Sequence, residues 1–135
     1  MLSPKRTKFR KYQKGDIKKI KPNTTKLNFG LYGLKSLESC IITAKTIEAV
    51  RRSITRNFKR NGKIWVTVFP DVSVTQKPLE VRMGKGKGAP SYWVCRIQAG
   101  QVLFEMDGIP LQLAQQAVKL ADNRHHIKTQ LVIRM

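Results

Sequence analysis

Hydrophobic residues recur at helical spacing in the segment 43–62, which predicts a first helix. One face of this helix is apolar and would pack on the body of the protein: Ile47, Val50, Ile54 and Phe58. Another face would carry cations at intervals of four residues: Arg52, Arg56 and Arg60. Thr43 is a suitable N-cap, and Asn61-Gly62 is a suitable end because glycine readily adopts the left-handed conformation that terminates helices.

A second helix is predicted over residues 107–122. Pro110 suits its first turn, where the N–H group that proline lacks would have no partner within the helix. The apolar stripe of this helix is narrow and consists of Leu113, Ala117, Leu120 and Ala121.

Runs rich in β-branched and aromatic residues predict strands in the rest of the chain. They lie in segments 27–42 (one or two short strands), 63–69, 91–98, 101–106 and 128–135, with a further extended passage at 72–83 in which Pro78 restricts pairing to an edge or a bend. Ala99-Gly100 predicts a hairpin between two of these runs. The order of elements indicates an α+β domain over residues 27–135, with two helices packed on a mixed or antiparallel sheet.

The first 26 residues differ in composition from this domain. They contain ten Lys or Arg and one acid, Asp16, so their local net charge is 10 − 1 = +9. Such a segment has too little apolar surface to fold alone and is expected to form an extended arm. An organelle transit peptide is the alternative, but Pro4, Gly15 and Pro22 interrupt any amphipathic helix.

The charge of the whole chain narrows the class of partner. There are 27 Lys and Arg against 8 Asp and Glu, which gives a formal net charge of +19. A compact protein with this imbalance repels itself unless a polyanion neutralises it, and nucleic acid is the leading candidate. A membrane is less favoured, because no run of about 18 apolar residues is present to span one.

Three glycines and three cations share the seven residues from Arg82 to Gly88. They do not match a phosphate-binding P-loop, because Ala89-Pro90 and a predicted strand follow in place of a helix. Two interpretations remain. The segment is either a mobile hairpin tip, or a loop whose glycines let the backbone approach a polyanion while Arg82, Lys85 and Lys87 contact phosphates.

Aromatic residues also lie among the cations. Phe9 and Tyr12, within the arm, have no core to join and could stack on unpaired bases. Trp65 and Trp93 lie in apolar strand-like runs, and we expect both in the core.

Support for catalysis is weak. Glu105 and Asp107 are close in sequence, but their spacing in a strand is equally that of two solvated side chains. His125 and His126 adjoin a helix end, where capping or phosphate contact is expected. Cys40 and Cys95 have no metal-ligand spacing, so we expect small buried hydrophobes.

Four long motifs together resemble one known family. They are "LSPKRTKFRKYQKG", "IEAVRRSITRNFKRNGKIWVTVFPD", "KPLEVRMGKGKG" with "YWVCRIQAGQVLFEMDG", and "IKTQLVIRM". In this order they resemble ribosomal protein sixteen of the large subunit, the bacterial and organellar form whose counterpart in the eukaryotic cytosol is large-subunit protein ten. Asp16, Thr67 and the segment 17–26 depart from the family pattern.

The resemblance implies a structural protein without catalytic residues, metal or cofactor of its own, apart from Mg ions associated with rRNA. The implied partners are large-subunit rRNA near the peptidyl-transferase centre, tRNA in the aminoacyl and peptidyl sites, and neighbouring large-subunit proteins. The implied rRNA-binding residues match Pro4, Lys5, Arg6, Lys8, Phe9, Arg10, Lys11 and Lys14 of the arm, and Arg51, Arg52, Arg56 and Lys59 of the first helix. The implied loop near rRNA and tRNA matches Arg82, Met83, Gly84, Lys85, Gly86, Lys87 and Gly88.

Details of the motifs indicate a compartment. "KYQKG", "KRNGKIWV" and "GQVLFEMDG" are most similar to mitochondrial members, and Lys outnumbers Arg 17 to 10, as an AT-rich organelle genome would produce. Because the family motif begins at Ser3, we expect synthesis inside the organelle without a presequence; a plastid or bacterial origin is the alternative. Two other functions stay open at this point: a free RNA chaperone, and an RNA-modifying or RNA-cleaving enzyme that uses Glu105, Asp107 or His125.

Overall fold

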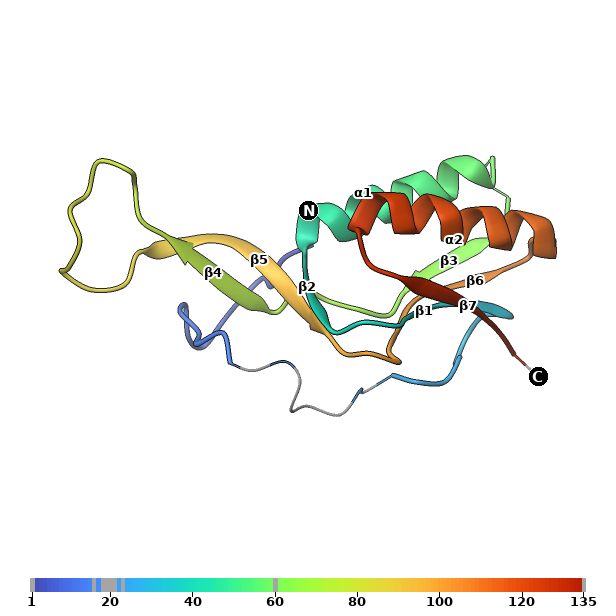
Figure 1. Ribbon diagram of the computed structural model, residues 1–135, viewed down its shortest axis with the longest axis horizontal. Helices are drawn as coiled ribbons and strands as arrows, with labels where there is room; N and C mark the ends of the chain where they lie inside the picture. Colours follow the sequence, from blue (N-terminus) through green and yellow to red (C-terminus); the bar gives the residue numbers. More distant parts are fainter. Residues whose placement is uncertain (1, 16, 18–21, 23, 60, 135) are drawn as a thin grey trace.

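Two antiparallel sheets and two helices make up the computed structural model, which describes residues 2–15, 17, 22, 24–59 and 61–134 (Figure 1). The four-stranded sheet has the order β3-β6-β1-β7, and the three-stranded sheet has the order β2-β5-β4. Their bounds are β1 Tyr32–Ser36, β2 Cys40–Thr43, β3 Lys63–Val66, β4 Val72–Gln76, β5 Ala89–Ile97, β6 Val102–Asp107 and β7 Thr129–Ile133. The predicted α+β class is confirmed.

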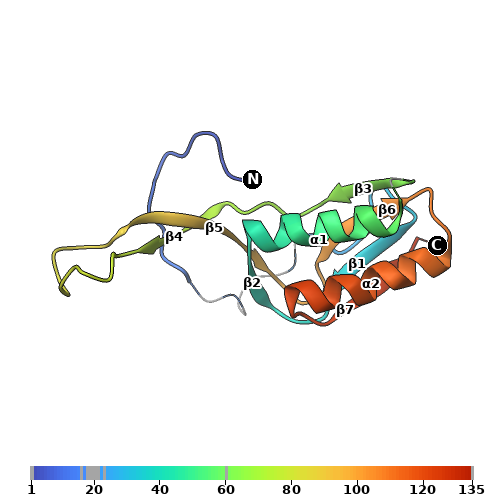
Figure 2. The ribbon, with the colours of Figure 1, turned by 90° about the horizontal axis from the view of Figure 1, so that it is seen from above.

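The helices α1 (Ala44–Asn57) and α2 (Leu111–His125) lie side by side over the four-stranded sheet (Figures 1 and 2). The predicted apolar face of the first helix is confirmed, since Ile47, Val50, Ile54 and Phe58 are all buried. In α2 the buried residues are Ala114, Ala117, Ala121 and His125, whereas Leu120 is only partly buried. Small side chains on this stripe let α2 approach α1 closely.

The C-terminal end of α1 and both ends of α2 differ from the predicted ones. Helix α1 stops at Asn57, because Phe58 turns into the core and Lys59 already has the left-handed φ of 50°. Gly62 therefore does not end the helix. It permits a close approach, since a Cβ there would lie 2.6 Å from the carbonyl oxygen of Asp107 on β6. Helix α2 begins after Pro110, which is its N-cap, and extends to His125.

Thr43 is the N-cap of α1, as predicted, and its Oγ1 accepts a hydrogen bond from the N–H of Thr46 at 3.2 Å. Replacing Thr43 with alanine should lower the free energy of unfolding by about 1 kcal/mol, because one helix N–H loses its acceptor. Urea unfolding measures this change. Thr55→Ala, in the same helix, is the matched control and should change stability little, since its hydroxyl only bonds back to the Arg51 carbonyl. Equal losses in the two variants would contradict a capping role.

The predicted hairpin at Ala99-Gly100 is wrong. β5 pairs with β2 and β4, and β6 pairs with β1 and β3, so this turn carries the chain from one sheet to the other. Two backbone hydrogen bonds connect the turn to the end of β1: the N–H of Gly100 donates to the carbonyl oxygen of Ser36 at 2.7 Å, and the N–H of Ser36 donates to the carbonyl oxygen of Gln101 at 2.8 Å. Residues Val102 to Met106 are buried on both faces of β6, so alternation along this strand could not reveal its partners.

Several strand boundaries also moved. The extended passage at 72–83 contains only the short strand β4, and the segment 63–69 only β3, whereas β5 begins at Ala89, earlier than expected. The segment 27–42 does contain two short strands, β1 and β2, as predicted. Trp65 and Trp93 are partly buried and lie outside the core, contrary to expectation; the Trp65 ring stacks on Phe29 with centroids 6.0 Å apart.

Candidate nucleic-acid interface

The arm has no helix or strand in residues 2–15 and lies across the edge of the three-stranded sheet. Ser73 Oγ on β4 donates a hydrogen bond to the carbonyl oxygen of Arg10 at 2.6 Å, and the Arg96 guanidinium on β5 donates to that of Lys14 at 3.3 Å. Ser73 is paired with Trp93, so these two side chains share one face, and Arg96 lies on the other face of β5. Because β4 is an edge strand, the arm wraps around this edge between Arg10 and Lys14.

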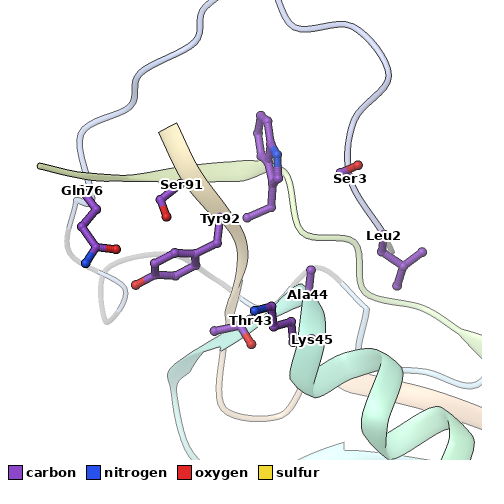
Figure 3. A pocket seen from close by; sticks show the side chains of 9 residues that line it. Leu2, Ser3, Thr43, Ala44, Lys45, Gln76, Ser91 and Tyr92 are labelled. Carbon is purple, nitrogen blue, oxygen red and sulfur yellow. The ribbon is translucent and has the colours of Figure 1, made fainter. Parts of the chain in front are cut away.

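The beginning of the arm contacts the body of the protein. Leu2 packs against the hydrophobic core, and an open cavity of about 730 Å³ lies between it, the start of α1 and strand β5 (Figure 3). The cavity is lined by Leu2, Ser3, Thr43, Ala44, Lys45, Gln76, Ser91, Tyr92 and Trp93. Lys45 lies in the first turn of α1, which has no acidic residue, so its charge adds to the positive end of the helix dipole.

The glycine-rich loop joins β4 to β5 and projects beyond the sheet, away from both helices (Figure 1). Gly84, Lys85 and Gly86 have left-handed φ values of 98°, 55° and 88°. A Cβ at either glycine would meet nothing within 4 Å, so backbone conformation, and not crowding within the protein, favours glycine there. Leu79 and Met83 in this loop are fully exposed, at 101% and 100%.

Arm and loop meet through Lys11 and Lys87, so the structure brings two of the three sequence-predicted groups together. The third group, on α1, lies on a helix that runs away from the loop (Figure 1). Arg82, Met83, Lys85 and Lys87 are all exposed, as are Lys5, Arg6, Lys8, Phe9, Arg10, Lys11 and Lys14. Tyr12 is partly buried.

Two of the helix cations have an acidic partner that sequence reasoning missed. Arg51 contacts both carboxylate oxygens of Glu48 at 2.6 and 3.0 Å, and Arg52 contacts Glu48 at 3.1 Å. These bonds, chiefly that from Arg51, lower the pKa of Glu48 to about 2, and they raise that of Arg51. Arg51 and Arg52 follow Glu48 by three and four residues, spacings that bring side chains together on a helix, so the sequence could have predicted this pairing. Arg56 and Lys59 stay exposed, while Arg60 lies outside the described residues.

Glu105 is not a solvated side chain, contrary to the expectation from its spacing. It is completely buried, and its carboxylate accepts hydrogen bonds from the backbone N–H groups of Asn28, Phe29 and Gly30 at 3.1, 2.6 and 2.9 Å. It therefore anchors the segment before β1 to β6. Asp107, by contrast, is partly exposed and accepts only a local bond from Gly108.

The remaining residues considered for chemistry have structural contacts. His125 Nδ1 accepts a bond from the N–H of Ile127 at 3.1 Å, and His126 is the left-handed C-cap of α2, so both contribute to the helix end. Cys95 is buried and Cys40 partly buried, both as free thiols, and burial raises the pKa of each to about 11. In the described part of the chain, no group of three or more His, Cys, Asp or Glu residues is placed to hold a metal ion.

The protein should lose stability as the pH falls below about 6.5, the ordinary pKa of histidine. Burial lowers the pKa of His125, so between the two values the unfolded chain binds a proton that the folded chain does not. Urea unfolding from pH 7.5 to 5 measures the effect. His125→Gln should flatten the pH dependence, whereas His126→Asn, at the exposed neighbouring position, should retain it. A wild-type midpoint that does not change over this range would contradict the prediction.

An α+β body with an arginine- and lysine-rich arm and a cationic loop is typical of a nucleic-acid-binding protein. Comparison with known proteins is more specific: the family described as ribosomal protein L16p/L10e matches residues 4–132. The chain belongs to this family of ribosomal proteins, which confirms the resemblance and the assignment as a structural protein in place of an enzyme.

Relatives match along the whole chain. Large ribosomal subunit protein uL16m of Prototheca wickerhamii is 57% identical over 133 residues, 98% of each chain. Large ribosomal subunit protein uL16 of Azorhizobium caulinodans is 54% identical, and that of Maricaulis maris 51%, each over 135 residues that cover 100% of this chain and 98% of the relative. Among the residues that the structure describes, no helix has the length and hydrophobicity needed to cross a bilayer.

Proposed function

We propose that this large-subunit ribosomal protein binds large-subunit rRNA beside the aminoacyl-tRNA cleft and the peptidyl-transferase centre, where it supports tRNA placement and late subunit assembly. The family match over residues 4–132 is the observation that carries this proposal. The charge distribution supports it, because exposed cations crowd the arm and the loop while the two sheets and two helices form an ordinary core.

The proposed rRNA contacts come from three groups, and the segment 1–26 acts as an arm on the body 27–135. The arm contributes Lys5, Arg6, Lys8, Phe9, Arg10, Lys11 and Lys14, helix α1 contributes Arg51, Arg52, Arg56 and Lys59, and the loop from Arg82 to Gly88 approaches rRNA and tRNA. Its glycines make the loop thin and its cations make it positive, the two properties needed to pass between RNA helices. Mg ions held by the rRNA would share in neutralising phosphates near these groups.

The proposed location is the mitochondrial ribosome, with neighbouring large-subunit proteins and tRNA in the aminoacyl and peptidyl sites as further partners. The full-length likeness to the protein named uL16m supports this location. Bacterial relatives at 54% identity support the alternative of a bacterial ribosome nearly as well.

Sucrose-gradient fractionation of the source cells, or of their purified organelles, tests the proposal. After a high-salt wash the protein should stay near-stoichiometric with rRNA in the large-subunit and monosome peaks. Its release to the top of the gradient, with abundant free protein before the wash, would overturn the proposal and indicate a transient RNA chaperone. Recovery in gradients of isolated mitochondria would support the mitochondrial location, whereas recovery on the ribosomes of a source cell without organelles would support the bacterial one.

A further inference from the structure

Two reciprocal hydrogen bonds join the arm to the glycine-rich loop. Lys11 Nζ in the arm donates to the backbone carbonyl oxygen of Lys87 at 2.7 Å, and Lys87 Nζ in the loop donates to that of Tyr12 at 2.5 Å. The bonded residues are 76 and 75 positions apart in sequence. Both donors are charged, so these bonds are stronger than those between neutral groups. We call this pair of contacts the clasp.

The segments on either side of the clasp are anchored. The buried Ser73 hydroxyl holds the Arg10 carbonyl, and Arg96 holds that of Lys14, so the arm is fixed immediately before and after Lys11 and Tyr12. The loop is narrow at its base, where a Cβ on Gly88 would lie 2.6 Å from the carbonyl oxygen of Gln76. The clasp therefore connects two segments that the fold has already brought side by side.

Among the described residues, no other cation of the arm or the loop joins the two segments; Lys77, at the start of the loop, donates within the loop to the carbonyl oxygen of Gly84 at 2.5 Å. Within the described residues, the side chains of Lys8 and Lys85 donate no hydrogen bond; Lys8 Nζ lies 5.6 Å from the centroid of the Phe9 ring. Lys8 and Lys85 thus differ from Lys11 and Lys87 in what their ammonium groups contact, although all four side chains are exposed.

We infer that Lys11 and Lys87 are positioning residues that hold the arm and the loop together in the free protein, so that both meet RNA as one preformed surface. Without the clasp, the like charges of the loop and the anchored arm would favour their separation, and the loop would sample many positions relative to the arm. Ordering a flexible loop during binding weakens affinity, and a clasp formed beforehand removes part of that loss. The role in RNA binding rests on the proposed function, whereas the clasp itself does not.

A distance measurement on the free, full-length protein tests the clasp without RNA. In a background in which the free thiols are removed by Cys40→Ala and Cys95→Ala, spin labels at Gln13→Cys in the arm and Met83→Cys in the loop, both exposed positions, report the arm-to-loop distance by pulsed electron resonance. The labelled protein with both lysines intact should give one narrow distribution of arm-to-loop distances, and adding Lys11→Met or Lys87→Met should broaden it. The matched controls Lys8→Met and Lys85→Met, which remove the same charges, should leave it narrow. A broad distribution before substitution, or equal effects of all four changes, would overturn the inference.

Binding to protein-free large-subunit rRNA at fixed low salt tests the consequence. Because loss of either clasp bond loosens the loop from the arm, Lys11→Met and Lys87→Met should each weaken binding by about 5-fold, and the loss in the double variant should be clearly smaller than the product of the two single losses. Losses from Lys8→Met and Lys85→Met should instead multiply in their double variant. Multiplying losses in both pairs would overturn the coupling. If the wild type does not bind this RNA at all, the proposed function fails, and the distance measurement still decides the clasp.

Discussion

Replacing Glu105 with alanine should lower the free energy of unfolding by about 3 kcal/mol. The carboxylate is completely buried in β6 and accepts bonds from three consecutive backbone N–H groups, those of Asn28, Phe29 and Gly30. Removing it leaves these donors without their acceptor at a place that water reaches poorly. Glu105→Gln, which keeps the shape and one carbonyl oxygen, should cost about half as much.

Urea unfolding at constant ionic strength measures both changes. Asp107→Ala on the same strand is the matched control, because Asp107 is partly exposed and accepts only from its neighbour Gly108; it should cost less than about 1 kcal/mol. If Glu105→Ala were as stable as the wild type, the cost of burying the charge would offset its hydrogen bonds. Glu105 would then determine only where the segment before β1 lies.

Binding of the free protein to its rRNA site should weaken by roughly 10³ to 10⁵ between 50 and 200 mM salt. This range follows if the arm and the loop contact about 6 to 10 phosphates, by analogy with duplex DNA, because each contact releases counterions. Filter binding or fluorescence anisotropy across a salt series measures it. A flat salt response would contradict the phosphate-contact account.

Deleting residues 2–14 should reduce the magnitude of this salt slope by about 4 to 5, since six Lys or Arg are removed. Lys119→Met with Arg124→Met, which removes two exposed cations from α2, is the control and should leave the slope unchanged. The deletion also takes away the acceptor of the buried Ser73 hydroxyl, which costs about 1 to 3 kcal/mol of stability. If the deletion lowered stability without weakening RNA binding, the arm would contribute to the core of the protein and not to the RNA interface.

Local patterns sufficed where a feature depends on neighbours in sequence. The apolar face of α1, its Thr43 cap and the α+β class followed from spacing and side-chain type within short windows. The C-terminal end of α1 was less predictable, because the burial of Phe58 and the left-handed Lys59 ended the helix before Gly62. The Glu48 pairing with Arg51 was within reach of the same local argument.

Only the tertiary structure decided how distant segments meet. Division of the strands into two sheets depends on which strands pair, and β6 is buried on both faces, so its alternation carried no information about its partners. The burial of Glu105 requires the N–H groups of residues 28–30, about 75 positions earlier in the chain. The contact between Lys11 and Lys87 likewise exists only because the arm wraps around β4. Sequence periodicity records neighbours within a few residues, whereas these contacts are created when the folded backbone brings remote donors and acceptors together.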